Sequence, residues 1–129
     1  MSTITLTLTT VTKADQAKAD QAVDQYRTNG GGSNRTNWSR LALVAGAIAT
    51  VLRTGKAVEV TGLFTDTEAK APAYNIAHRA LSAGAVRPDW HRVRVVALAD
   101  CQTAKGSVTG VSNTTARTGH VRLFYVLAD

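Results

Sequence analysis

The stretch VAGAIATVLRTGKAVEVTG, residues 44–62, contains the pattern that decides the fold. Apolar residues recur every three or four positions through its first part, which predicts an amphipathic helix over residues 38–53. The apolar stripe consists of Trp38, Leu41, Ala45, Ile48 and Leu52. Asn37 is a favourable N-cap, and Gly55 stands where a left-handed residue ends a helix. The alternating valines that follow predict a strand over residues 57–64.

The residues before this helix contain one strand signal and one helix signal. Threonines alternate with Ile4, Leu6 and Leu8 over residues 3–9, which predicts a half-buried strand with a hydroxyl-bearing outer face. Residues 13–27 are strong helix formers with little to bury, so we expect an exposed, loosely docked helix that begins after Thr12. Residues 28–37 include three consecutive glycines and are typical of a linker.

The residues after the stretch predict a further helix and two strands. Thr65 and Glu68 form a capping-box pattern, and Gly84 ends the helix that follows. Because Pro72 cannot lie in a helix interior, either that helix kinks or the true helix starts with Pro72; we favour the second. Residues 92–98 and 120–127 predict strands. Between them, residues 99–119 are rich in Gly, Ser and Thr, which indicates a long, mobile connection.

Length and cysteine content exclude several classes of protein. A chain of 129 residues predicts a single domain, with residues 12–37 as an inserted helix and Gly-rich linker. The lone Cys101 excludes a disulfide framework and, with three scattered histidines, a four-ligand zinc site. No apolar run approaches the roughly 20 residues that cross a bilayer, and residues 1–11 do not resemble a secretory signal. We therefore expect a soluble, cytoplasmic protein without a membrane partner.

The positive charge of the chain is unevenly placed. The net charge is +6, and residues 35–129 contain twelve basic against six acidic side chains, whereas residues 1–34 are balanced. Nine of those twelve are arginines, whose planar guanidinium group suits phosphates and base edges. Such a surplus indicates a polyanionic partner, most often nucleic acid. The simpler interpretation is that the charge serves solubility.

Three groups of basic residues are candidate phosphate contacts. Arg35 and Arg40 bracket the start of the main helix, whose N–H groups already favour an anion, so this is the best anion site in the sequence. If strands 92–98 and 120–127 pair, several cationic or titratable side chains share one face. These are Arg92, Arg94, His120 and Arg122. Lys105 and Arg117 belong to the long connection, from which they could reach a groove.

Catalytic motifs are absent from the sequence. Cys101 has only His91 and His120 as conceivable partners, and a lone cysteine is far more often a packed residue than a nucleophile. No GxSxG, P-loop or GxGxxG pattern occurs. We therefore expect no enzyme activity, no cofactor, no metal and no small-molecule substrate.

From Val44 onward the order of elements resembles a known family. An alanine-rich helix with VAGAIATVLRTG, a valine strand, the helix APAYNIAHRAL, the strand RVRVVAL and the strand HVRLFYVL follow one another. This pattern resembles the Alba superfamily of small nucleic-acid-binding proteins, and within it the stage V sporulation protein S family. The resemblance implies a dimer with a βαβαββ fold and a long hairpin. It also implies nucleic-acid contacts at Arg35, Arg40, Lys70, Lys105 and Arg117.

These observations combine into one expectation of fold and one of function. The expected fold is α+β: an Alba-like, four-stranded mixed sheet with two main helices on one face and an extra N-terminal helix. The expected function is largely sequence-independent binding of DNA or RNA by a homodimer, which would be nucleoid-associated if DNA is the ligand. The alternative is a protein-interaction or regulatory module that uses its alanine-rich surface for assembly. A third hypothesis is a small enzyme that uses Cys101.

Overall fold

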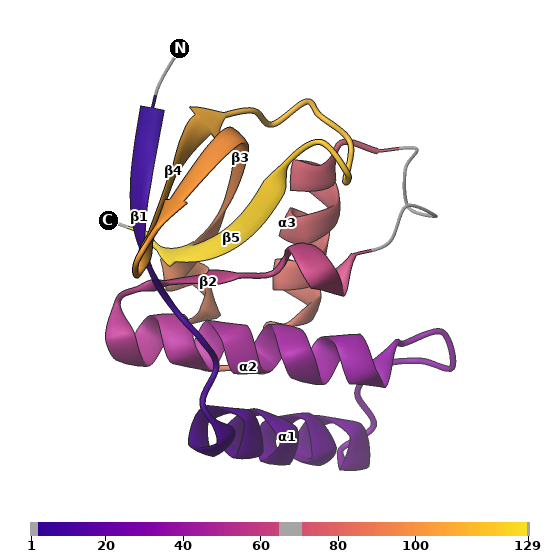
Figure 1. Ribbon diagram of the computed structural model, residues 1–129. Helices are drawn as coiled ribbons and strands as arrows, with labels where there is room; N and C mark the ends of the chain where they lie inside the picture. Colours follow the sequence, from indigo (N-terminus) through magenta and orange to yellow (C-terminus); the bar gives the residue numbers. More distant parts are fainter. Residues whose placement is uncertain (1–2, 65–70, 129) are drawn as a thin grey trace.

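The computed structural model describes residues 3–64 and 71–128 and places three helices and five strands there (Figure 1). In chain order these are β1 (Thr3–Thr9), α1 (Lys13–Thr28), α2 (Trp38–Thr54), β2 (Ala57–Glu59), α3 (Ala73–Ala83), β3 (Val93–Ala104), β4 (Ser107–Ser112) and β5 (Arg122–Leu127). Short 3-10 turns cover η1 (Thr61–Leu63) and η3 (Trp90–Arg92).

The strands form a closed barrel in the order β1-β2-β5-β3-β4, with β4 returning to β1. The closing pair is antiparallel, with Thr5 opposite Thr109, whereas β1 and β2 are parallel, with Leu8 opposite Ala57. The expected open, four-stranded Alba-like sheet is therefore wrong. The fifth strand, β4, comes from the connection that the composition indicated to be mobile and unstructured.

Burial of β5 and β3 on both faces explains why the sheet closes. Leu123 and Tyr125 face the helices, whereas Phe124 and Val126 face the barrel interior, and all four are buried. Strands buried on both sides read as continuous apolar runs, as residues 123–127 of β5 do. An irregularity between Ala99 and Gln102 lets β3 bend around this interior.

Helices α2 and α3 pack on the same outer face of the barrel, as predicted for the two main helices. Val44, Ile48 and Val51 of α2 and Ile76 of α3 share one buried cluster with the outward residues of β3 and β5. The Tyr125 hydroxyl donates a 3.0 Å hydrogen bond to the carbonyl oxygen of Ala77, and burial raises the pKa of this phenol. Helix α3 is thereby tied to the centre of the sheet.

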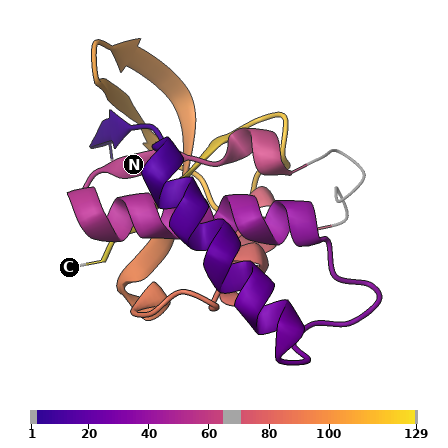
Figure 2. The ribbon, with the colours of Figure 1, turned by 90° about the horizontal axis from the view of Figure 1, so that it is seen from below.

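Helix α1 is mostly exposed, as predicted, and docks on α2 through three buried residues, Asp15, Ala19 and Val23. It lies across α2 (Figure 2), with Ala19 and Val23 buried against Leu41 and Ala45. The Thr12 side chain caps its N-terminus as predicted, since its oxygen accepts the amide of Asp15 at 3.1 Å. The Asp15 carboxylate, however, faces α2 and is buried there. The sequence did not indicate that Asp15 is buried there.

The element boundaries mostly follow the capping signals. Asn37 caps α2 and Gly55 ends it with a φ of 71°, as predicted. Strand β2 is shorter than residues 57–64, because the chain turns into η1 after Val60. Pro72 is the N-cap of α3 rather than its first residue. The predicted capping box of Thr65 and Glu68 lies outside the described residues.

Candidate functional site

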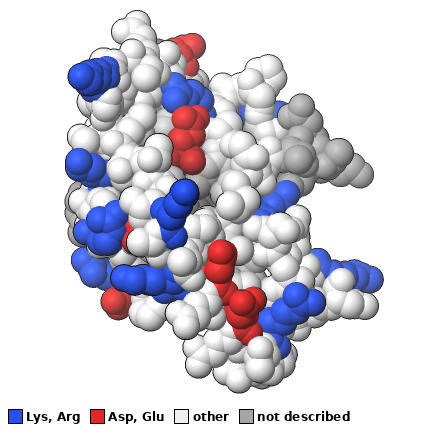
Figure 3. Space-filling view, turned by 60° about the horizontal axis from the view of Figure 1, so that its bottom comes forward, with Lys and Arg blue, Asp and Glu red and all other residues white. Residues whose placement is uncertain are grey.

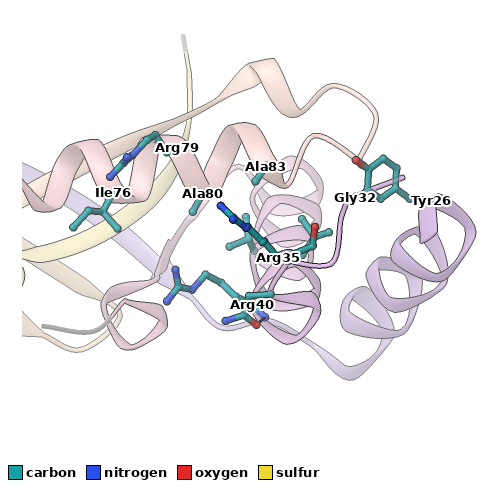
Figure 4. A pocket seen from close by; sticks show the side chains of 12 residues that line it. Tyr26, Gly32, Arg35, Arg40, Ile76, Arg79, Ala80 and Ala83 are labelled. Carbon is teal, nitrogen blue, oxygen red and sulfur yellow. Dashed lines mark hydrogen bonds between the residues drawn. The ribbon is translucent and has the colours of Figure 1, made fainter. Parts of the chain in front are cut away.

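A cleft of about 470 Å³ lies between the linker, the start of α2 and one face of α3. Three arginines line it, each from a different segment: Arg35 from the linker, Arg40 from α2 and Arg79 from α3 (Figure 4). Among the described residues, no acidic side chain lines this cleft. The arrangement favours an anion, because Arg35 and Arg79 are exposed and no described residue forms an ion pair with either.

The glycine-rich linker is an ordered turn that carries Arg35 to the cleft. The N–H of Gly31 donates to the carbonyl oxygen of Tyr26 at 2.8 Å, and the Ser33 amide donates to the Thr36 hydroxyl at 2.8 Å. A Cβ on Gly31 would collide with the Tyr26 ring, and one on Gly32 would lie 2.6 Å from the Trp38 ring. A larger residue at either position would force one of these rings to move, and Gly32 also has a φ of 79°, which favours glycine.

The three guanidinium groups have different surroundings. That of Arg40 lies 5.5 Å from the centroid of the Phe64 ring, and the Arg40 backbone N–H donates to the Asn37 side chain at 3.0 Å. Arg35 and Arg79 are exposed and form no ion pair with any described residue. Their charge is therefore available to a ligand.

The floor of the cleft is apolar. It consists of Leu41, Val44, Ile76, Ala80 and Ala83, and the ring of Tyr26 stands at one end. A site with several cations above an apolar floor can hold a ligand that combines an anionic group with a flat, weakly polar one.

Sequence reasoning identified Arg35 and Arg40 but missed Arg79. The signal was present, because Ile76, Arg79, Ala80 and Ala83 recur at helical spacing and share one face of α3. What the sequence could not show is that this face lies opposite the start of α2.

Strands β3 and β5 pair as the predicted cluster of cations requires, and Arg94 and Arg122 lie on the same side of the ladder, but the cations do not come together. Arg94 lies opposite Val126 and Arg122 opposite Leu98, so the two arginines are four residues apart along the ladder, about 13 Å. Arg122 is also paired: its guanidinium donates to the Glu59 carboxylate at 2.7 and 2.9 Å and to the Thr103 hydroxyl at 2.8 Å. The Arg122 hydrogen bonds lower the pKa of Glu59, although burial opposes this. Arg92 lies at the end of η3.

The expected hairpin over residues 99–119 would have placed Lys105 and Arg117 on one arm. In the structure they lie in different segments. Lys105 lies at the tip of the β3–β4 hairpin, which projects from the barrel in Figure 2. Arg117 lies in the loop between β4 and β5, beside the start of α3, where the Ala73 amide donates to the Ala116 carbonyl oxygen at 2.9 Å. Lys70 lies outside the described residues.

The charge elsewhere on the helical side is mixed. Figure 3 shows basic and acidic side chains interspersed over this side rather than one continuous basic field. The described part of this side therefore has no continuous basic surface along which a polyanion could bind by charge alone. The cleft is consequently the strongest candidate for a defined contact.

The surroundings of Cys101 do not favour a nucleophile. Its thiol donates to the carbonyl oxygen of Leu98 at 3.4 Å, and burial raises its pKa above the usual range, which lowers the fraction of reactive thiolate. In residues 3–64 and 71–128, no three His, Cys, Asp or Glu side chains are grouped to hold a metal ion. No helix in those ranges is long and apolar enough to cross a membrane.

Comparisons with protein-family models, curated proteins and solved structures gave no significant match to this chain. The resemblance to the Alba superfamily therefore stays a prediction from sequence pattern. Functional inference has to rest on the cleft and its arginines.

Proposed function

We propose that this protein binds nucleic acid without catalysing a reaction, and that the cleft is where it holds the phosphate backbone. One observation carries the proposal: Arg35 from the linker and Arg79 from α3 line one cleft, which Arg40 also lines, and neither Arg35 nor Arg79 forms an ion pair with a described residue. Guanidinium groups are the side chains best suited to phosphate oxygens. The excess of arginine over residues 35–129 points to the same class of partner.

Binding of this kind depends little on base sequence, because phosphate contacts position a protein without reading bases. We place the protein in the cytoplasm, where its partner would be RNA or the DNA of the nucleoid. On the described surface, Tyr26 and Leu43 are the only large hydrophobic side chains that are exposed. These two residues do not identify a dimer interface, so the homodimer stays a prediction. Lys105 at the hairpin tip and Arg117 beside α3 are candidate outlying contacts.

The alternative function is a protein-interaction module that assembles through its alanine-rich surface. In the structure that surface is buried. Ala45, Ala47 and Ala49 of α2 are buried between α1 and the barrel layer. No described observation favours this alternative over nucleic-acid binding.

The decisive experiment removes two cleft arginines at once. A fluorescein-labelled 20-nucleotide single-stranded DNA, its duplex and the matching RNA are titrated with protein at several salt concentrations. The Arg35→Ala/Arg79→Ala variant should bind more weakly, and the slope of log K against log salt should fall by about 1.4 on single strands or about 1.8 on duplex. Two lost phosphate contacts produce this change.

A charge-matched control separates the cleft from the overall charge. The Lys18→Ala/Lys56→Ala variant loses the same two charges from exposed positions outside the cleft. It should bind nearly as well as the unmodified protein. Equal weakening by both variants, or no binding by the unmodified protein at low salt, would show that the cleft is not a phosphate site.

A further inference from the structure

The apolar floor of the cleft can bind a second ligand group besides a phosphate. Five apolar residues from α2 and α3 line the cleft together with the arginines. Leu41, Val44 and Ile76 are buried, whereas Ala80 and Ala83 of α3 keep apolar surface that a phosphate alone would not cover. The volume of about 470 Å³ falls within the range of roughly 300–1,000 Å³ typical of sites that enclose a small organic group. The cleft is therefore larger and less polar than an isolated phosphate requires.

Of the two aromatic rings at this end of the molecule, Tyr26 lines the cleft and Trp38 does not. Trp38 is covered, since the Arg27 guanidinium lies 4.9 Å from its ring centroid and Gly32 lies against it. Tyr26 lines the cleft and remains 40% exposed, although its ring also contacts Gly31 and lies 6.3 Å from that of Trp38. An exposed edge of an aromatic ring beside an apolar floor suits a planar, weakly polar group.

A nucleotide supplies both groups only when its base is unstacked. In a duplex the bases are stacked inside and only the backbone and groove edges are exposed, so the apolar floor would stay uncovered. In single strands the bases can be splayed out and laid on apolar and aromatic side chains. The arginines at the rim and the floor below match the two halves of such a nucleotide.

We propose that the cleft receives one unpaired nucleotide, with its phosphate at Arg35 and Arg79 and its base on the α3 side of the floor, against Ala80 and Ala83. The inference rests on the proposed function and adds the class of nucleic acid: the protein prefers single-stranded over duplex ligands. The preference comes from the floor, whereas the arginines serve both kinds of ligand.

The test fills the floor without changing the charge. Ala83 lines the cleft from an exposed position of α3, so Ala83→Leu narrows the space for a base and leaves the barrel core intact. Ala17→Leu makes the same change at an exposed position of α1 outside the cleft and serves as the control. Circular dichroism melting checks that both variants fold. Affinities are measured for the 20-nucleotide single strand and for its duplex at one salt concentration.

The unmodified protein should bind the single strand at least about tenfold more tightly than the duplex. Ala83→Leu should lower single-strand affinity about tenfold, the low end of what stacking one base contributes, and leave duplex affinity unchanged. Ala17→Leu should change neither. Equal affinities for the two ligands, or an Ala83→Leu variant that behaves like the control, would overturn the inference. The Arg35→Ala/Arg79→Ala experiment would still decide the proposed function. Loss of all binding in the unmodified protein removes the proposed function itself.

Discussion

Asp15 shows how a single side chain attaches a whole helix. Its carboxylate is only 5% exposed, yet it lies 2.9 Å from the Arg53 guanidinium and accepts a 2.9 Å hydrogen bond from the Thr50 hydroxyl. A buried charge persists only when it is paired and hydrogen-bonded in this way. The hydrogen bond from Arg53 is the main cause that lowers the pKa of Asp15, and burial opposes it.

At pH 7 the free energy of unfolding of the Asp15→Asn variant should be about 1–2 kcal/mol lower than that of the unmodified protein. This is the usual contribution of a charged hydrogen bond, reduced because the Arg53 side chain is half exposed. Because the folded-state pKa is depressed, this stabilisation is complete above the ordinary value of 3.8 and disappears as pH falls through the lower folded-state value. Urea titrations of both proteins at several pH values should therefore give a difference that shrinks below about pH 4. A constant difference down to pH 2 would contradict the assignment to this ion pair.

At the scale of elements, a single glycine permits the barrel to close. Gly110 of β4 lies against β3 at its irregularity: an added Cβ would stand 2.9 Å from the Ala99 carbonyl oxygen and 2.9 Å from the Leu98 Cβ. Those neighbours are backbone and a buried side chain, which cannot move away cheaply. Glycine in a strand interior often marks such a close approach.

Gly110→Ala should consequently destabilise the protein by about 1–3 kcal/mol, the usual range for overpacking. Gly119→Ala is the matched control in the following loop, because nothing lies within 4 Å of its added Cβ. That variant should stay within about 0.5 kcal/mol of the unmodified protein. Thermal and urea unfolding measure both. A Gly110→Ala variant as stable as the control would show that β3 and β4 are further apart than described.

The elements that the sequence predicted well are those with local signals. Asn37 and Gly55 mark the ends of α2, and the alternation over residues 3–9 marks β1. Each signal acts on residues that are near it in the chain. Strand β4 has no comparable signal, since SVTGVS becomes a strand only by pairing with β1 and β3 on either side. The cleft is similar: Arg35 and Arg40 are adjacent to a helix start, whereas Arg79 joins them through tertiary packing alone.

At the scale of the whole molecule, the buried residues divide into three clusters. One lies between the barrel and helices α2 and α3, one inside the barrel, and one between α1 and α2. Strand β5 contributes to the first two, whereas the third contains only α1 and α2 residues among its buried members. We therefore predict that helix α1 separates from α2 while the barrel remains folded, and that the cleft then loses Tyr26 and the turn that carries Arg35.

Native-state hydrogen exchange tests this separation. Amides of α1 should exchange through a local opening, at a lower free energy than those of β5, which require global unfolding. Val126→Ala removes two buried methyl groups from the barrel interior, on the order of 2 kcal/mol, and weakens the docked and undocked forms equally. It should therefore speed exchange in β5 about 30-fold and leave α1 unchanged. Asp15→Asn should speed both, because either opening breaks its ion pair. If Val126→Ala accelerates α1 and β5 together, the molecule unfolds as one unit and α1 has no separate opening.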